Sequence, residues 1–315
     1  MTVHILFEND AWLPPLTDAL TRRGIAYEAH FLEGGVLDLT AEPAPGVYLN
    51  RMSPSSHTRG HQGGVRLVQE WLEVLEAHGR PVINGSRAFA LEISKIRQDV
   101  ALRAAGIRTP ETLAVIDGDL KAAARRLGPP FITKHNQGGK GLGVRLYRSV
   151  ESFDEAVDAG EVEAGPGGVV LLQRYIEPRE PYITRVEIVD GQFLYAIKSS
   201  TEGGFELCPA DACAIDDDAF CPVDGGDTFS LREDLTADDP LVQAYIRFLA
   251  DNRIDLAGIE FVEDRDGVRW TYDVNGTTNF NGTLEAQHGL DGMGAIAELA
   301  ERKLGEVGRR LSKAG

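Results

Sequence analysis

The sequence predicts a mixed α/β (α+β) protein made of three consecutive units. Apolar strand-like runs alternate with helical patterns over residues 1–90, which is typical of a parallel sheet with helical crossovers. Further along the chain, Asp190-Gly191 and Asp266-Gly267 each separate two apolar runs and so predict antiparallel hairpins. We therefore expect domains at residues 1–90, 91–172 and 173–315.

In the first unit, four apolar runs are typical of strands and two amphipathic stretches are typical of helices. The strands are expected at residues 3–7, 26–32, 46–51 and 81–85, and the helices at 12–24 and 63–79. Gly24 and Gly79 mark the helix ends, because glycine readily takes the left-handed conformation that follows many helices. This alternation predicts a small α/β domain.

The second and third units mix helices with paired strands. In the second unit we expect helices at residues 86–106, 119–128 and 149–160, and strands at 130–134, 143–147 and 169–176. In the third we expect hairpins over residues 182–198 and 256–276, and helices at 239–253 and 291–311. The hairpin signals predict antiparallel pairing in both units.

The composition excludes several classes of protein. The chain has 315 residues and 43% hydrophobic content, which is typical of a globular protein. Its formal net charge of -17 argues against nucleic acid or an anionic membrane as the main partner. No apolar run is long enough to span a membrane and no secretory signal is visible, so we expect a cytoplasmic protein. Cys208, Cys213 and Cys221 form an odd set that fits a reducing compartment, and their role stays open.

Four glycines and two lysines lie between two apolar runs in PFITKHNQGGKGLGVRLY, residues Pro130–Tyr147. Glycine lets the backbone approach another group closely and lysine adds positive charge, so the stretch is suited to cradle phosphate. It matches neither the G-x-x-x-x-G-K-[ST] nor the G-x-G-x-x-G spacing. A glycine-rich hairpin tip without a ligand is the alternative, and this stretch alone does not decide between the two.

Three oxygen-bearing side chains are predicted to converge on the hairpin at residues 256–276. Alternation along its second strand places Asp273 and Asn275 on one face, and a regular register places Glu260 opposite them. Two carboxylates and an amide oxygen suit Mg²⁺, which completes its shell with water and phosphate oxygens. The alternative is a solvated sheet face whose acidic residues point to water.

A Mg²⁺ site and a glycine–lysine phosphate loop in one chain together point to ATP. Lys95 and Lys134 lie among apolar neighbours, where an ammonium group can pair with phosphate oxygens. Arg185 lies on a predicted strand and, aimed at the same cleft, would stabilise developing negative charge. An exposed strand arginine is the ordinary alternative.

Five stretches, in this order, resemble the ATP-grasp ligases, and in particular the RimK-type and LysX-type carboxylate–amine ligases. The resemblance covers nearly the whole chain. ISKIRQDVALRAAGIRTPET is similar to the lysine-bearing helix of the family, PFITKHNQGGKGLGV to its second ATP lysine and flexible loop, and LLQRYI to its hinge strand. RVEIVDGQFLYAIK resembles its arginine-bearing hairpin, and GIEF with YDVN resembles its metal-binding strands.

The resemblance implies a three-domain ATP-grasp fold with an N-terminal parallel-sheet pre-ATP-grasp domain at residues 1–90. Residues 91–172 would form a central subdomain with a glycine-rich lid, and residues 173–315 a C-terminal subdomain with the metal site. ATP would bind between the central and C-terminal subdomains, together with two Mg²⁺ ions. The implied ATP-binding residues are Lys95, Lys134, Gly138, Gly139, Lys140, Gly141, Gly143, Gln173, Tyr175 and Ile176; the metal ligands are Glu260, Asp273 and Asn275; the catalytic residues are Arg185 and Lys134.

The implied activity is that of an ADP-forming, carbon–nitrogen bond-forming ligase. ATP would convert a carboxylate into an acyl phosphate, and an amine would then displace phosphate. The substrates would be small molecules or peptides, such as an amino acid or a specialised biosynthetic intermediate. Two alternatives stay open: an ATP-grasp phosphotransferase with a stable phosphorylated product, and a nucleotide-binding protein without turnover. A monomer and a homo-oligomer are both compatible with the sequence.

The chain departs from the family where the substrate is expected. The Arg/Asn-rich substrate loop is replaced by GGFELCPADACAIDDDAFCP, which has no basic residue, so a different acceptor is expected. The basic stretch NRMSPSSHTRGH instead follows a predicted parallel strand, and loops at that edge of a sheet commonly bind ligands. Candidate substrate residues are Arg51, His57, Arg59, His61 and Asn279, and a polar surface loop is the alternative.

Overall fold

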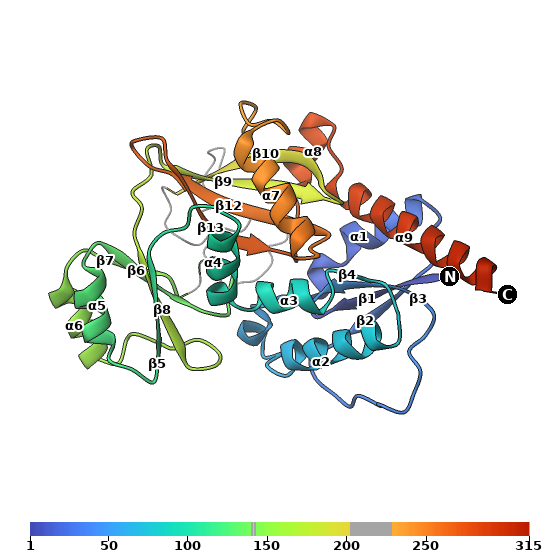
Figure 1. The fold of residues 1–315 in the computed structure, drawn as a ribbon, viewed down its shortest axis with the longest axis horizontal. Helices are drawn as coiled ribbons and strands as arrows, with labels where there is room; N and C mark the ends of the chain where they lie inside the picture. Colours follow the sequence, from blue (N-terminus) through green and yellow to red (C-terminus); the bar gives the residue numbers. More distant parts are fainter. Residues whose placement is uncertain (140, 142, 202–228, 315) are drawn as a thin grey trace.

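The computed structural model describes residues 1–139, 141, 143–201 and 229–314. It contains three sheets with helices packed around them, which confirms the predicted α/β fold (Figure 1). Lys140 and the three cysteines lie outside these residues. Within the described part of the chain, no helix has both the length and the apolarity needed to cross a membrane.

The first sheet is parallel, with strand order β2-β1-β3-β4. Its strands are β1 (Thr2–Phe7), β2 (Tyr27–Phe31), β3 (Gly46–Arg51) and β4 (Val82–Ile83). Helix α1 (Pro14–Arg22) connects β1 to β2, and α2 (Gly64–Ala77) connects β3 to β4. Gly24 and Gly79 follow these helices at positive φ, 67° and 69°, as the sequence predicts.

The central sheet is antiparallel, with strand order β5-β8-β6-β7. Its strands are β5 (Thr112–Ile116), β6 (Phe131–His135), β7 (Arg145–Tyr147) and β8 (Val169–Arg174), and its helices are α5 (Leu120–Leu127) and α6 (Val150–Asp158). Phe153 of α6 packs edge-on against Phe131 and Tyr147 of the sheet. The strands β6 and β7 pair on either side of the glycine-rich stretch, as predicted.

The C-terminal sheet is also antiparallel, with strand order β11-β10-β9-β12-β13. Its strands are β9 (Tyr182–Val189), β10 (Gln192–Ser200), β11 (Phe229–Leu231), β12 (Leu256–Glu263) and β13 (Arg269–Asn275), and its helices are α7 (Pro240–Asp251) and α8 (Gly282–His288). Asp190 and Gly191 both take positive φ, 52° and 71°, in the predicted hairpin between β9 and β10.

The prediction of one helix over residues 86–106 is wrong, because the structure has two, α3 (Ser86–Glu92) and α4 (Lys95–Ala104). Ser94 is extended between them and caps α4, its side chain accepting from the Arg97 N–H. Both helices pack against β13 and share a hydrophobic cluster with the C-terminal sheet. The domain boundaries at residues 90 and 172 stay a prediction.

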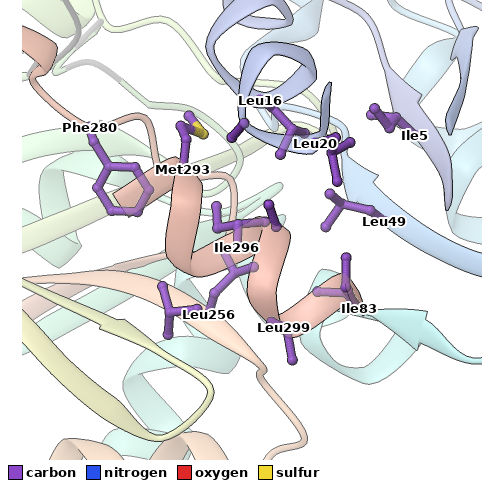
Figure 2. Packing of buried hydrophobic residues seen from close by; sticks show 14 of the residues in the cluster. Ile5, Leu16, Leu20, Leu49, Ile83, Leu256, Phe280, Met293, Ile296 and Leu299 are labelled. Atoms are coloured by element: carbon purple, nitrogen blue, oxygen red, sulfur yellow. The ribbon is translucent and has the colours of Figure 1, made fainter. Parts of the chain in front are cut away.

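The long C-terminal helix α9 (Gly292–Ala314) brings the end of the chain back to the first sheet. It packs against α1 and β3, and its apolar side chains share one cluster with strands of the first and C-terminal sheets (Figure 2). Ile296 is fully buried in this cluster, together with Leu49 of β3 and Leu256 of β12. The cluster holds the first sheet against the C-terminal sheet and so fixes the space between them.

We expect Ile296→Ala to lower the free energy of unfolding by about 2–5 kcal/mol, because it opens a cavity in this cluster. Chemical unfolding followed by circular dichroism measures the change. Ile116→Ala is the matched control, since Ile116 is 59% exposed on β5 and its truncation should cost less than about 1 kcal/mol. Equal losses in the two variants would contradict the role given to the cluster.

Candidate active site

A cavity of about 330 Å³ lies between the central and C-terminal sheets and the loops that follow strands of the first sheet. It is lined by segments that follow β1 and β3, by β6 and β8, and by β9, β12 and β13. This volume is within the range of small-molecule sites. The predicted site residues that line it are Lys95, Lys134, Gly138, Gly139, Gly141, Gln173, Tyr175, Ile176, Arg185, Glu260, Asp273, Asn275 and Asn279.

Strand register brings the candidate metal ligands together. Glu260 on β12 lies opposite Asp273 on β13, which confirms the predicted register, and also opposite Arg185 on β9. Asn275 follows Asp273 by two residues, so both side chains leave the same face of β13. The register between β12 and β13 changes just after this pair, between Glu260 and Phe261. The two carboxylates and the amide therefore reach one cavity from neighbouring strands.

The guanidinium group of Arg185 is buried and held by three side chains. Its Nε lies 2.6 Å from Glu187 Oε1, its Nη1 lies 2.8 Å from Glu260 Oε1, and its Nη2 lies 2.7 Å from Thr278 Oγ1. Burial acts to lower the pKa of Arg185, but the carboxylates of Glu187 and Glu260 outweigh burial and raise the pKa. The group is a fixed positive charge in the cavity wall, unlike an exposed strand arginine.

Gly258 on β12 leaves room for this guanidinium group. A Cβ atom at position 258 would lie 2.4 Å from both Nε and Nη2 of Arg185. A larger residue would displace the arginine, because that distance is far inside van der Waals contact. Nothing in the motif GIEF predicts this packing.

Lys95 enters the cavity from the first turn of α4. Asn136, just after β6, fixes this turn: its carbonyl accepts from the Lys95 N–H at 2.9 Å, and its side chain accepts from the Ile96 N–H at 3.0 Å. The Nζ of Lys95 then lies 2.5 Å from Asp273 Oδ1. The helix break at Ser94 and the end of β6 thus decide where this ammonium group lies.

Lys134 on β6 lines the same cavity and is 7% exposed. Burial lowers the pKa of Lys134 to about 7, and the nearby charge of Lys95 adds to the effect. An anion bound close to both groups would raise this pKa again, because it favours the charged form. The two lysines therefore suit an anionic ligand such as phosphate.

The pKa values of the two candidate carboxylate ligands shift in opposite directions. Burial raises the pKa of Glu260, although Arg185 opposes the rise. Burial acts in the same direction on Asp273, but Lys95 and Lys134 outweigh it and the pKa of Asp273 is lowered. Two carboxylates and one amide oxygen in a single cavity form a ligand set that Mg²⁺ accepts.

The cavity wall next to the central sheet is more apolar. It includes Ile132, Val144, Tyr175, Ile176 and Pro178. Gln173 is oriented there by a hydrogen bond of 2.8 Å from its Nε2 to Thr112 Oγ1. Gly143 is not part of the lining; a Cβ there would lie 2.9 Å from the ring of His135, so this glycine makes room for that ring.

The candidate substrate residues fall into two groups. The cavity lining includes Asn279 but not Arg51, His57, Arg59 or His61. Arg51 is buried and donates to Thr278 O at 2.7 Å and to Asn279 Oδ1 at 2.6 Å, so it positions Asn279. Arg59 and His61 both pair with the buried carboxylate of Glu8. Direct contact of these residues with a substrate stays a prediction.

Sequence reasoning missed several cavity-lining residues, among them Trp12, Ser53, Ser55 and Glu92. Glu92 ends α3, is 6% exposed, and accepts from the Thr277 N–H at 2.8 Å. Burial raises the pKa of Glu92 to about 7, against the opposing hydrogen bonds from Thr277. Among the described residues, no cation lies within ion-pair distance of Glu92. The sequence feature that could have identified Glu92 is an acidic residue among apolar ones in ALEISK.

No family model matches the sequence. The D-alanine–D-alanine ligase of Ruegeria sp. (strain TM1040) is 27% identical over 200 residues, which cover 60% of this chain and 61% of that protein, less than two thirds of its length. The ligase of the same name from Synechococcus sp. (strain JA-3-3Ab) is 28% identical over 262 residues, covering 80% of this chain and 74% of that protein. Among solved structures, the RimK domain protein ATP-grasp from Sphaerobacter thermophilus DSM 20745 matches with a TM-score of 0.66 at 18% identity, covering 95% of this chain and 98% of that chain.

The three sheets, the cavity between them and these likenesses define an ATP-grasp fold. The resemblance seen in the sequence is confirmed at the level of the fold: the chain has the fold of ATP-grasp proteins and is similar in sequence to D-alanine–D-alanine ligases. The proteins that it resembles in sequence are ligases by name, which agrees with the predicted class of enzyme.

We expect Gly258→Ala to weaken the binding of Mg²⁺–AMP-PNP by at least tenfold, or about 1.4 kcal/mol, because the added Cβ displaces Arg185 from Glu260. Isothermal titration calorimetry measures the change. Gly305→Ala is the control, since a Cβ there meets only the end of the Arg309 side chain, at 3.7 Å. Nucleotide binding that is unchanged in a folded Gly258→Ala variant would contradict the role of this close packing.

Proposed function

We propose that this chain is an ATP- and Mg²⁺-dependent carboxylate–amine ligase that releases ADP and phosphate. One observation carries the proposal: three cationic side chains and three oxygen-bearing side chains line the same cavity. They are Lys95, Lys134 and Arg185, and Glu260, Asp273 and Asn275. The cations suit phosphate oxygens and the oxygen donors suit Mg²⁺. The sequence relatives, which are ligases by name, support the same assignment.

In this proposal the nucleotide lies between the central and C-terminal sheets. The apolar wall with Gln173, Tyr175 and Ile176 would contact the adenine ring. The glycine-rich stretch would cover the phosphates through Gly138, Gly139, Lys140, Gly141 and Gly143. Glycine at these positions lets the backbone N–H groups come close to phosphate oxygens.

The chemistry then follows from fixed charges. Two Mg²⁺ ions would neutralise the phosphate charge, and Glu260, Asp273 and Asn275 would hold them. Lys95 and Lys134 would orient the phosphates, and Arg185 would stabilise the charge that develops as a carboxylate attacks the γ-phosphate. The same guanidinium group would stabilise the oxyanion that forms when an amine attacks the acyl phosphate. Because its three partners already hold it, Arg185 needs little reorganisation during either step.

We further propose that the substrates bind next to the first sheet, where the lining includes Trp12, Ser53, Ser55, Glu92 and Asn279. A buried carboxylate is costly unless it is paired, and among the described residues Glu92 forms no direct salt bridge, since the charge of Arg51 reaches it only from a longer distance. The ammonium group of a substrate would supply the partner for a direct salt bridge. Amino acids are therefore the first candidates, D-alanine among them, since the sequence relatives are D-alanine–D-alanine ligases by name.

We expect the chain with Mg²⁺–ATP to release ADP and phosphate in equal amounts, and only when a carboxylate and an amine substrate are both present. Pools of L- and D-amino acids and small peptides, with ADP, AMP and phosphate followed separately, test this. Lys95→Met should abolish turnover, because it removes a phosphate-binding charge. Lys121→Met is the matched control, since Lys121 pairs with Asp158 on the surface.

The other outcomes separate the alternatives. Release of AMP would contradict an acyl-phosphate mechanism. ADP without phosphate would identify a phosphotransferase with a phosphorylated product. Tight nucleotide binding without turnover in any pool would favour the non-catalytic alternative.

We expect Glu92→Gln to raise KM for the amine substrate found in that assay by about tenfold or more, since a hydrogen bond to a charged group contributes about 1.5–3 kcal/mol. KM for ATP should not change. Glu73→Gln, at an exposed position of α2, is the control. An increase confined to KM for ATP would contradict the assignment of Glu92 to the substrate.

A further inference from the structure

Three side chains with metal-binding atoms lie together on the first sheet, outside the cavity. Glu28 and His30 are two residues apart on the edge strand β2, and His4 on β1 lies opposite Glu28 in the parallel register. Residues two apart on a strand leave the same face, so Glu28 and His30 point to one side of the sheet. None of the three lines the candidate active site.

The potential ligand atoms are close enough to share one cation. His4 Nδ1 lies 3.1 Å from His30 Nε2 and 3.4 Å from Glu28 Oε2, and all three atoms lie within 4.8 Å of one another. Zinc binds imidazole nitrogen and carboxylate oxygen at about 2.0–2.2 Å in tetrahedral geometry, which puts neighbouring donor atoms about 3.3–3.6 Å apart. The two short separations are close to this range, so a small adjustment of side chains would admit the ion.

Hydrogen bonds within the cluster cannot satisfy all three groups at once. A neutral imidazole has one N–H, so Nδ1 of His4 can donate to His30 or to Glu28 but not serve both. If His30 donates to His4 Nδ1 instead, His4 Nδ1 carries no N–H and cannot donate to the carboxylate of Glu28. A divalent cation would accept lone pairs from all three atoms.

The protein holds the His4 ring in a fixed orientation. The residue is 2% exposed, and its ring stacks on Tyr48 of β3 with the centroids 4.6 Å apart. Gly46 leaves space for the ring, since a Cβ there would lie 2.9 Å from Cδ2 and Nε2 of His4. The Glu28 side chain is 62% exposed, so water can reach a bound ion.

We propose that His4 Nδ1, His30 Nε2 and Glu28 Oε2 form a Zn²⁺ site with water as the fourth ligand. Two imidazoles and one carboxylate favour zinc over Mg²⁺ or Ca²⁺, which prefer oxygen ligands. The ion would link the exposed edge strand β2 to β1 and so stabilise the first sheet, because a ligand that binds only the folded state raises stability. The site is independent of the proposed ligase reaction.

Titration of the full, metal-free chain with Co²⁺ in excess Mg²⁺ tests the proposal. Co²⁺ absorbs strongly in the visible range in a four-coordinate site and weakly in a six-coordinate oxygen site, so the candidate Mg²⁺ ligands do not interfere. We expect one equivalent of Co²⁺ to give the strong band, Zn²⁺ to displace it, and Zn²⁺ to raise the thermal midpoint. His30→Ala should lose the strong band, and Glu28→Gln should weaken Co²⁺ binding by about tenfold or more, since each removes a ligand.

His78→Ala, at an exposed position just after α2, is the matched control and should keep the band. Glu28→Gln keeps the test valid if His30→Ala fails to fold, because the Glu28 side chain is exposed. A wild-type chain without the strong band would overturn the proposal. A band that persists unchanged in Glu28→Gln and in folded His30→Ala would also overturn it, because the ligands would then lie elsewhere.

Discussion

The buried guanidinium group of Arg185 is the interaction on which the arrangement of the cavity depends. It joins Glu187 of its own strand to Glu260 of the neighbouring strand and to Thr278 beyond β13. Arg51 binds the carbonyl of Thr278 as well, so the network continues into the first sheet. Moving Arg185 away from these partners would be costly, because it would leave buried charges without compensation.

Apolar packing and one buried amide keep the surrounding units in register with this network. The hydrophobic cluster around α9 joins the first sheet to the C-terminal sheet (Figure 2), and a second cluster joins α3 and α4 to the same C-terminal sheet. Between them, the Asn84 side chain donates to the carbonyls of Leu256 and Gly276 and accepts from the Asp255 N–H. These contacts connect segments far apart in the chain, and together they position the walls of the cavity.

The charge distribution suits a nucleotide bound together with metal ions. The chain carries a formal net charge of -17, yet its cavity gathers Lys95, Lys134 and Arg185. Local positive charge in a low-dielectric cleft attracts an anion even when the distant surface is acidic. The neighbouring carboxylates would repel a bare polyanion, and a divalent cation bound with the phosphates removes that repulsion.

The sequence by itself determined most of the local structure and the part of the site that lies on regular strands. Alternation along β12 and β13 and the turn at Asp266-Gly267 are short-range features, so the pairing of Glu260 with Asp273 could be predicted before the structure. The helix break at Ser94 could not, because the residue that fixes it, Asn136, lies 42 positions away. The place of Glu92 in the cavity, the space that Gly258 leaves for Arg185 and the meeting of His4 with His30 likewise depend on packing between distant segments. Hydrophobic periodicity reflects only the contacts between residues close in the sequence. Tertiary structure alone decided which of these distant side chains meet.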